Sequence, residues 1–352
     1  MEKMGRNRTP KKMSTKNKKG SSFEEIQSAV IDILEGAPAW IILTHVKPDG
    51  DTLGSGSALY SLGASLGKKV FWGGEDPYPR GYSFLPEAGS YIPGIDPGEL
   101  LHREGGAAII LDTSTEDRSL PGVRALSEKF PVINIDHHGD NELFGSLNWI
   151  DSAASSVGEM VWSLLSFWKK DYPLKTAEGL YTAIVTDSGN FTFSSTGEKT
   201  HRAAADLLSR GVAPEKIEDL LRSNRSLSSL HLWGRAFERA EIHSSFAGVT
   251  WLFRKDFAET GSAPSETEFL VNELLTLRGI TFAAFLVEEE DAVRASLRSK
   301  GDISAVEIAR TFGGGGHLNA AGCKIPLPLE SAKDTLVELL EKINALRAAP
   351  SR

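Results

Sequence analysis

Three short apolar stretches, each followed closely by an acidic or imidazole side chain, constrain the fold of this chain most strongly. They are AWIIL at residues 39–43, AAIIL at 107–111 and VINI at 132–135. Segments of helical spacing separate them, such as FEEIQSAVIDILEG at 23–36. Continuous apolar strands that alternate with helices are typical of a parallel sheet buried on both faces. The sequence therefore predicts an α/β fold with a doubly wound, mainly parallel sheet.

The pattern changes near residue 224. Residues 240–253 and 280–299 each have the apolar pattern of a β-hairpin, and helices are expected at 265–277, 302–312 and 328–347. This predicts a second, smaller α/β domain, with the active site in the cleft between the two domains. The expected parts are a disordered basic tail at 1–21, a first domain at 22–215, a linker at 216–226 and a second domain at 227–347.

Composition restricts the partners of the chain. The formal net charge is −8, but residues 1–20 carry about +7, so the remainder carries about −15. An acidic body is poorly suited to hold duplex DNA by counterion release, whereas a small anionic substrate needs only a few local basic groups. No apolar run is long enough for a membrane span. The single cysteine, Cys323, favours a reducing compartment and a buried structural role, so we expect a cytoplasmic protein. A homodimer is compatible with the sequence.

Aspartate and histidine side chains gather where predicted elements end. They are His45, Asp49 and Asp51; Asp112; Asp136, His137 and His138; and Asp187. Ligands of open α/β sheets bind at the carboxyl ends of the strands, and carboxylates crowded there repel one another unless cations intervene. The pattern predicts two divalent ions about 4 Å apart, which activate a water at a phosphoryl centre. Because the set contains imidazoles, Mn²⁺ is the first choice, followed by Co²⁺, Zn²⁺ or Fe²⁺, with Mg²⁺ also compatible.

Each motif also has a simpler interpretation when it is taken by itself. The KPDG segment at 47–50 is a good turn sequence, and aspartate is a common helix cap. DHH at 136–138 could be a capping aspartate with two surface histidines, and TDSGNF at 186–191 could be a helix end and turn. The joint occurrence of these motifs, in this order, favours the metal site.

A second group of residues predicts an anion site in the second domain. Four consecutive glycines at 313–316 would let backbone N–H groups approach an anion, and His317 follows them directly. Arg298, at the end of a predicted strand, could grip a terminal phosphate with two hydrogen bonds. Two alternatives stay open: the glycines could form a helix C-cap and turn, and Arg298 could be a solvated residue at a strand end.

These residues resemble the DHH phosphoesterase superfamily, in particular its subfamily with a DHHA1 domain. Its four dispersed motifs resemble HVKPDGD at 45–51, LDTS at 111–114, DHH at 136–138 and TDSGNF at 186–191. GGGGHLNAAG at 313–322 resembles the signature of the DHHA1 domain. The likeness extends over residues 23–345, and it implies an enzyme that hydrolyses phosphoesters with the help of metal ions.

The resemblance also implies a role for each residue. The metal ligands would be His45 and Asp49 for one ion, Asp51, His137 and Asp187 for the other, and Asp112 as the bridge between them. The catalytic groups would be Asp136, which orients a neighbouring imidazole, and His138, which faces the substrate phosphate. The substrate-binding residues would be Arg298, Gly313, Gly314, Gly315, Gly316 and His317.

Similar two-domain proteins of this size are nano-RNases, so the resemblance implies short substrates. We predict hydrolysis of single-stranded RNA of two to five nucleotides, removal of the 3′-phosphate of adenosine 3′,5′-bisphosphate, or both. The alternative substrates are cyclic or linear dinucleotide second messengers. Two non-catalytic alternatives are a nucleotide-binding regulatory module and a metal-dependent structural protein. The complete ligand set argues against the first, and His138, Arg298 and the glycines argue against the second.

Overall fold

The computed structural model describes residues 22–222, 226–267 and 269–348. The chain divides into two compact units, of which unit 1 ends at residue 224 and unit 2 begins at residue 225. The expected basic tail at 1–21 lies outside the described residues. Most of the expected linker at 216–226 is helical, because helix α8 (Pro214–Arg222) extends into it.

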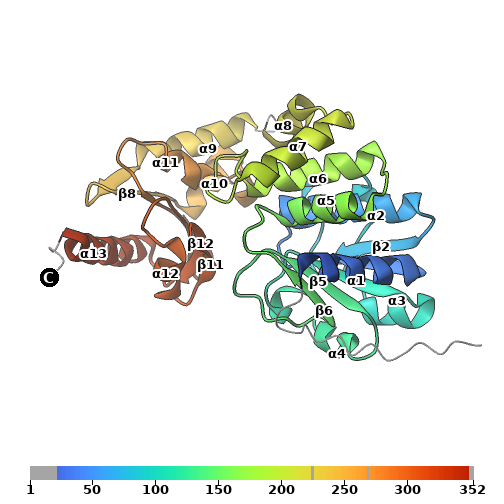
Figure 1. Cartoon of the computed structure of the whole chain (residues 1–352). Helices are drawn as coiled ribbons and strands as arrows, with labels where there is room; N and C mark the ends of the chain where they lie inside the picture. The colour runs from blue at the N-terminus through green and yellow to red at the C-terminus, as the bar shows by residue number, and fades with distance from the viewer. Residues whose placement is uncertain (1–21, 223–225, 268, 349–352) are drawn as a thin grey trace, which may run out of the picture. The chain divides into compact units, whose positions relative to one another are not determined.

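A parallel six-stranded sheet with the strand order β3-β2-β1-β4-β5-β6 forms the centre of unit 1 (Figure 1). The strands are β1 (Ala39–Leu43), β2 (Lys69–Gly74), β3 (Tyr91–Pro93), β4 (Ala107–Leu111), β5 (Val132–Asp136) and β6 (Leu147–Ile150). This order confirms the predicted doubly wound parallel sheet. The direction of winding reverses between β1 and β4, and open sheets of this kind bind ligands at such a point.

Helices cover both faces of this sheet, as the side chains of β1 show. Trp40 and Ile42 pack into a core with α1, α2, α5, α6, α7 and α8, whereas Ala39 and Ile41 pack into a second core with α3 and α4. The remaining helices of unit 1 are α1 (Phe23–Gly36), α2 (Gly50–Ser65), α3 (Pro97–Glu104), α4 (Val123–Ser127), α5 (Val157–Trp168), α6 (Leu174–Asp187) and α7 (Glu198–Ser209). Burial on both sides explains why β1 and β4 are apolar throughout.

Unit 2 is built on a mixed six-stranded sheet with the order β11-β12-β10-β9-β8-β7. Its strands are β7 (Glu241–His243), β8 (Ala247–Leu252), β9 (Phe282–Glu288), β10 (Val293–Ser299), β11 (Gly315–His317) and β12 (Ala320–Ile325). The pairs β7–β8 and β9–β10 are antiparallel, which confirms the two predicted hairpins, whereas β8 and β9 are parallel. Cys323 is buried in β12, as expected.

The helices of unit 2 follow the sequence pattern with some changes at their ends. They are α9 (Leu227–Glu238), α10 (Arg254–Thr260), α11 (Leu270–Leu274), α12 (Ala305–Arg310) and α13 (Leu329–Ala348). The helix expected at 265–277 is instead a 3₁₀ turn at Pro264–Thr267 followed by α11, because Phe269 between them has a φ of +64°. Within the described part of the chain, no helix combines the length and apolarity needed to cross a membrane.

Candidate metal centre

Parallel pairing brings the predicted site residues to one edge of the sheet in unit 1. Strands β1, β4 and β5 are direct neighbours in the order β1-β4-β5. His45 follows β1, Asp112 follows β4 and His137 follows β5. These residues lie at the carboxyl ends of adjacent strands, as predicted, and next to the point where the winding reverses.

Asp49 and Asp51 are held by the start of α2. Asp49 caps this helix, since its Oδ1 accepts hydrogen bonds from the backbone N–H of Asp51 at 3.1 Å and of Thr52 at 3.3 Å. The same oxygen lies 3.6 Å from His45 Nε2. The simpler interpretation of Asp49 as a helix cap is therefore correct, but Asp49 also faces the histidine of the first motif.

Close packing of α2 on α6 positions the remaining aspartate. A Cβ added to Gly54 would lie 2.6 Å from the carbonyl oxygen of Gly179, so only glycine allows this approach of the two helices. Helix α2 carries Asp51 in its first turn, and α6 ends at Asp187. Their contact brings both carboxylates to within about 4 Å or less of His137, as the distances below show.

The first candidate ligand group consists of His45, Asp49 and Asp112, whose ligand atoms all lie within 4.8 Å of one another. His45 Nε2 is 3.3 Å from Asp112 Oδ2. The other ring nitrogen of His45, Nδ1, lies 2.8 Å from the Val46 carbonyl oxygen, which can only accept a hydrogen bond. The proton therefore belongs on Nδ1, and Nε2 is directed to the site as a metal-bound imidazole requires.

The second group consists of Asp51, His137 and Asp187, again within 4.8 Å. His137 Nε2 lies 3.4 Å from Asp187 Oδ2 and 4.0 Å from Asp51 Oδ2, while its Nδ1 lies 3.2 Å from the Ala154 carbonyl. The Asp51 carboxylate accepts hydrogen bonds from the backbone N–H groups of Val157 and Gly158, at the start of α5. A helix N-terminus stabilises the negative charge of this aspartate.

Asp112 lies between the two groups. Its Oδ2 faces His45, and its Oδ1 lies 3.4 Å from His137 Nε2 and 3.5 Å from His138 Nδ1. Asp112 has a φ of +57°, a backbone conformation that aspartate tolerates better than most side chains. This turn at the end of β4 places one carboxylate within reach of both histidine-containing groups.

The charges of the site are unbalanced in the way that a cation would correct. Burial raises the pKa of Asp51, and the nearby charges of Asp112 and Asp187 raise it further. Burial raises the pKa of Asp187, and the charges of Asp112 and Asp49 raise it further against the opposing effect of His137, to about 7. Burial lowers the pKa of His45, but Asp112 and Asp49 outweigh this and raise it to about 10.

Two polar atoms at the centre of the site support the same conclusion. His45 Nε2 and Asp112 Oδ1 are buried, and neither makes a hydrogen bond with the described residues. A divalent ion would give both atoms a direct contact in place of the hydrogen bonds that they lack, and a set of carboxylates with imidazoles suits such an ion. The residues therefore fit the metal dependence expected from the motifs.

Asp136 and His138 form a buried pair beside these groups, and His138 also lies with Asp112 and His137 in a third possible ligand group. Asp136 Oδ1 lies 2.7 Å from His138 Nδ1 and also accepts a hydrogen bond from the His137 backbone N–H. Because a carboxylate can only accept, His138 carries its proton on Nδ1, and a substrate contact would involve Nε2. Asn141 donates to Asp136 Oδ2 at 2.6 Å and to the Thr113 carbonyl at 3.0 Å.

The candidate anion-binding residues lie in unit 2. Arg298 pairs with Ala320, which in turn pairs with His317, so Arg298 and His317 lie in one row across β10, β12 and β11. Burial lowers the pKa of Arg298, and its guanidinium donates to the Leu297 carbonyl. Within the described part of the chain, no carboxylate forms an ion pair with it. Arg298 is therefore a half-buried cation that could accept an anionic group.

The four glycines combine both interpretations given for them. Gly313 and Gly314 donate hydrogen bonds to the end of α12, which is a C-cap arrangement. Gly313 and Gly316 have φ values of +71° and +137°, and Gly314 and Gly316 lie close to β12. Gly315 needs neither a positive φ nor a close approach, since an added Cβ would meet open space. The fold thus explains three of the four glycines without a ligand.

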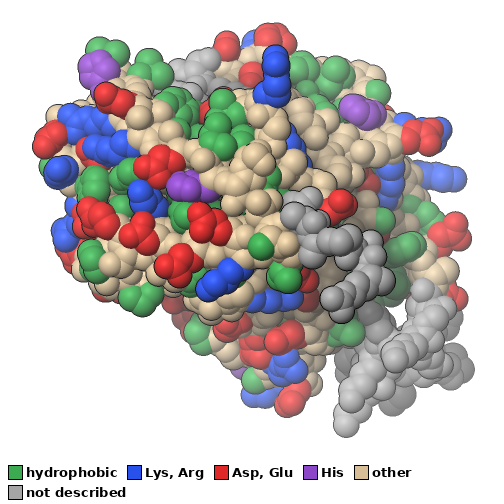
Figure 2. All heavy atoms as spheres, turned by 90° about the vertical axis from the view of Figure 1, so that its left-hand side faces the viewer, with side chains coloured by type: hydrophobic (Ala, Val, Ile, Leu, Met, Phe, Trp, Pro, Cys, Tyr) green, Lys and Arg blue, Asp and Glu red, His purple; other side chains and the backbone are tan. Residues whose placement is uncertain are grey.

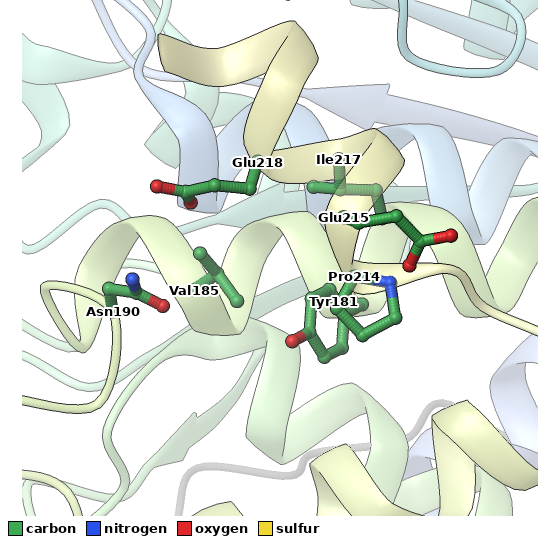
Figure 3. Close-up of a pocket in the computed structure, with 7 residues that line it drawn as sticks. All are labelled: Tyr181, Val185, Asn190, Pro214, Glu215, Ile217 and Glu218. Atoms are coloured by element: carbon green, nitrogen blue, oxygen red, sulfur yellow. The ribbon is translucent and has the colours of Figure 1, made fainter. Parts of the chain in front are cut away.

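Away from these residues, neither the hollow described next nor the distribution of surface charge indicates a binding site. A hollow of about 260 Å³ lies between α6 and α8 and is lined by Tyr181, Val185, Asn190, Pro214, Glu215, Ile217 and Glu218 (Figure 3). None of the candidate ligands lines it, and its charged residues are both glutamates. On the described part of the face in Figure 2, acidic and basic side chains are interspersed rather than gathered into a basic stripe.

Sequence reasoning missed the residues that support the site. Asn141 follows the DHH motif closely, but an asparagine there could equally be a helix cap, so the sequence alone gives it no role. The segment 151–159, which contacts both His137 and Asp51, was not singled out. The spacing of Ser156 and Glu159 is a recognisable helix-start signal, but nothing in the sequence shows which helices lie beside them.

Two family models match the chain. The model described as the DHH family, N-terminal domain, matches residues 40–184, and the model described as the DHHA1 domain matches residues 249–346. Curated relatives extend over nearly the whole chain, as given below. The chain belongs to the DHH family of phosphoesterases, with a DHHA1 domain, and is a metal-dependent hydrolase.

The relatives include a protein from Thermus thermophilus named bifunctional oligoribonuclease and PAP phosphatase NrnA. It is 35% identical over 322 residues, which cover 91% of this chain and 95% of that protein. A Bacillus subtilis protein of the same name is 30% identical over 298 residues, or 81% and 88% of the two chains. The solved structure of an exopolyphosphatase-related protein from Bacteroides fragilis matches with a TM-score of 0.85 at 26% identity, over 92% and 97% of the chains.

Proposed function

We propose that the protein hydrolyses single-stranded RNA of two to five nucleotides to mononucleotides, removes the 3′-phosphate of adenosine 3′,5′-bisphosphate, or does both. The observation that carries this proposal is the pair of ligand groups that meet at Asp112 and His137, an arrangement suited to phosphoester hydrolysis with two ions. The names of the Thermus thermophilus and Bacillus subtilis relatives support the choice of substrate.

We propose that His45 and Asp49 hold one ion, that Asp51, His137 and Asp187 hold the other, and that Asp112 bridges them. Mn²⁺ is the proposed metal because the set mixes carboxylates with imidazoles. Bound ions of this kind stabilise negative charge at phosphorus and lower the pKa of water.

The other residues act on the substrate. Asp136 fixes the tautomer and orientation of His138, which faces the phosphate and stabilises charge on the leaving oxygen. The end of the substrate that is remote from the metal ions is held by Arg298, Gly313, Gly314, Gly315, Gly316 and His317. That the active site lies in the cleft between the two domains remains a prediction. We further propose that the protein is cytoplasmic and does not bind duplex DNA. Light scattering would show whether it forms a homodimer.

The test is hydrolysis in Mn²⁺ of a panel that contains pApA, a five-nucleotide RNA, adenosine 3′,5′-bisphosphate, a cyclic dinucleotide, pyrophosphate and duplex DNA. We expect mononucleotides from the short RNAs or phosphate from the bisphosphate. Asp112→Ala should abolish either activity while the melting curve keeps a cooperative transition, since this variant removes the bridge between the groups. Hydrolysis of only the cyclic dinucleotide would instead favour the second-messenger alternative, and inactivity on every member would contradict the proposal.

Arg298 provides a separate test of substrate binding. Arg298→Ala should raise the KM for short RNA with a 5′-phosphate by about tenfold or more, because a charged hydrogen bond contributes roughly 1.5–3 kcal/mol. The kcat should change little, because the proposed metal ligands all belong to unit 1 whereas Arg298 belongs to unit 2. Arg294→Ala on the same strand is the matched control, since Arg294 pairs with Glu289 instead. Equal KM values for Arg298→Ala and the wild type would refute this role.

A further inference from the structure

A buried glutamate in unit 1 lies outside the ligand groups but is linked to one of them. Glu159, in the first turn of α5, is 2% exposed. Its Oε2 accepts hydrogen bonds from the Ser155 backbone N–H at 3.3 Å, the Ser155 hydroxyl at 2.8 Å and the Thr200 hydroxyl at 2.7 Å. Its Oε1 lies 3.5 Å from Lys199 Nζ. One carboxylate thus joins the segment before α5 to the start of α7.

This arrangement differs from an ordinary helix cap. In a capping box, the glutamate at the third helical position returns to the N–H of the cap residue itself. Here Ser156 is the cap and bonds to the Glu159 N–H, whereas the Glu159 carboxylate reaches one residue further back and also across to α7. Thr200 in turn accepts from the Gly197 N–H, so its hydroxyl is fixed at the start of α7. The contacts of Glu159 therefore fix the position of the segment as well as its helical form.

The segment that Glu159 fixes contacts two of the proposed metal ligands. The carbonyl of Ala154, next to Ser155, lies 3.2 Å from His137 Nδ1 and orients that ring. The N–H groups of Val157 and Gly158, on the other side of Ser156, donate to the two oxygens of Asp51 at 2.7 and 2.9 Å. Three backbone contacts within residues 154–158 thus set both His137 and Asp51.

The other ligand group has different supports. His45 is oriented by the Val46 carbonyl, and Asp49 is held by the first N–H groups of α2. Neither contact involves residues 151–159. A change at Glu159 should therefore affect the two groups unequally.

We infer that Glu159 is a positioning residue that selectively preorganises the Asp51, His137 and Asp187 ion site. This inference rests on the metal ligands proposed above. Without the carboxylate, the hydroxyls of Ser155 and Thr200, both buried, would lose their acceptor. The segment would shift to satisfy them and would carry the Ala154 carbonyl and the start of α5 with it.

The test is a Mn²⁺ titration of the full-length protein, followed by electron paramagnetic resonance and calorimetry. The wild type should bind two ions. In Glu159→Ala, one ion should bind about 10- to 100-fold more weakly and the other within about threefold of the wild type, since supports behind metal ligands have effects of this size. Adding His45→Ala to Glu159→Ala should leave no ion bound with wild-type affinity, which assigns the retained ion to the His45 group.

Further variants keep the test independent of any folding defect. Thr200→Val removes only the hydroxyl that reaches Glu159 from α7 and should weaken the same ion, whereas Thr200→Ser should restore its affinity. Asp256→Asn, which disrupts a buried carboxylate in unit 2, should lower stability without changing either ion.

Three outcomes would contradict the inference. Wild-type affinity for both ions in Glu159→Ala and Thr200→Val would overturn the inference and leave the proposed metal site standing. An equal weakening of both ions would do the same. A wild-type protein that binds no Mn²⁺ would overturn the proposed metal site together with the inference. Two bound ions in an inactive wild type would count only against the proposed function.

Discussion

At the scale of single residues, Asp136 links the chemistry of the site to its support. The side chain is fully buried, and its two oxygens have different partners. Oδ1 accepts hydrogen bonds from the His137 backbone N–H and from His138 Nδ1, and Oδ2 accepts one from Asn141. Asn141 also bonds to the Thr113 carbonyl and thus ties the segment after β5 to the segment after β4. The orientation of His138 therefore depends on a residue that contacts no candidate ligand.

We predict that Asn141→Ala lowers kcat on short RNA by about tenfold, because Asp136 loses a donor and His138 loses its fixed orientation. Steady-state rates in Mn²⁺ measure this effect. Asn148→Ala is the control, since Asn148 is an asparagine of the same unit whose side chain bonds to the Gly145 backbone. A similar kcat for the two variants would mean that Asn141 is only structural.

Asp256 in unit 2 provides a prediction about pH and stability. Burial raises the pKa of Asp256, but hydrogen bonds from Arg239, the Phe253 backbone and Arg235 outweigh this and lower it. A lowered pKa in the folded state stabilises the protein above the ordinary carboxyl pKa of about 4, and this contribution is lost as the pH falls below it. Asp256→Asn should therefore cost roughly 3 kcal/mol at pH 6 and clearly less at pH 3.

The measurement is urea unfolding of both proteins at the two pH values, followed through the transition of unit 2. Asparagine keeps the size of the side chain but cannot titrate, so the wild type should lose more stability than the variant on acidification. A difference that stays constant from pH 6 to pH 3 would contradict the assigned role of the carboxylate.

At the scale of elements, the strands were predictable and the helix contacts were not. AWIIL and AAIIL are apolar on both faces because helices cover both sides of β1 and β4, so composition alone identifies them. The aspartates and histidines that follow these strands were predictable for the same reason. The hydrogen bond from Thr200 to Glu159 joins residues 41 positions apart, and no local pattern encodes such a contact.

The contact between α2 and α6 gives a prediction at this scale. Gly54→Ala would place a Cβ 2.6 Å from the Gly179 carbonyl oxygen and force the helices apart. We expect a loss of about 1–3 kcal/mol in the free energy of unfolding, as for other overpacked cores. Because α2 carries Asp51 and α6 carries Asp187, the affinity for Mn²⁺ should fall as well.

Chemical denaturation and Mn²⁺ titration of the same preparation measure both effects. Gly234→Ala in α9 is the control, because an added Cβ there meets open space. That variant should be stabilised by about 0.5–1 kcal/mol, since alanine is a better helix former than glycine. Unchanged Mn²⁺ affinity in a destabilised Gly54→Ala would show that the ligand positions do not depend on this helix contact.

At the scale of the whole molecule, the change of pattern near residue 224 predicted two units, and the chain does divide there. The expected linker at 216–226 is helical up to Arg222, since α8 (Pro214–Arg222) has apolar residues at helical spacing over that stretch. The glycines at 313–316 show a related limit. Their sequence is compatible with both a helix cap and an anion site. The positive φ values and the contacts with β12 show that the fold alone requires three of the four glycines.

The division into units makes the response to metal removal specific. All the proposed ligands belong to unit 1, so bound ions stabilise that unit and leave unit 2 unaffected. At a free Mn²⁺ concentration of about 100 times the dissociation constant, each bound ion adds about 2.7 kcal/mol. For a unit of this size, chelation should lower the melting temperature of its transition by about 5–10 °C for each ion removed. Differential scanning calorimetry with and without a chelator should show one transition that moves and one that stays.

Asp112→Ala should abolish the shift, because it removes the carboxylate between the two groups. A shift of both transitions would instead place bound ions in unit 2 as well.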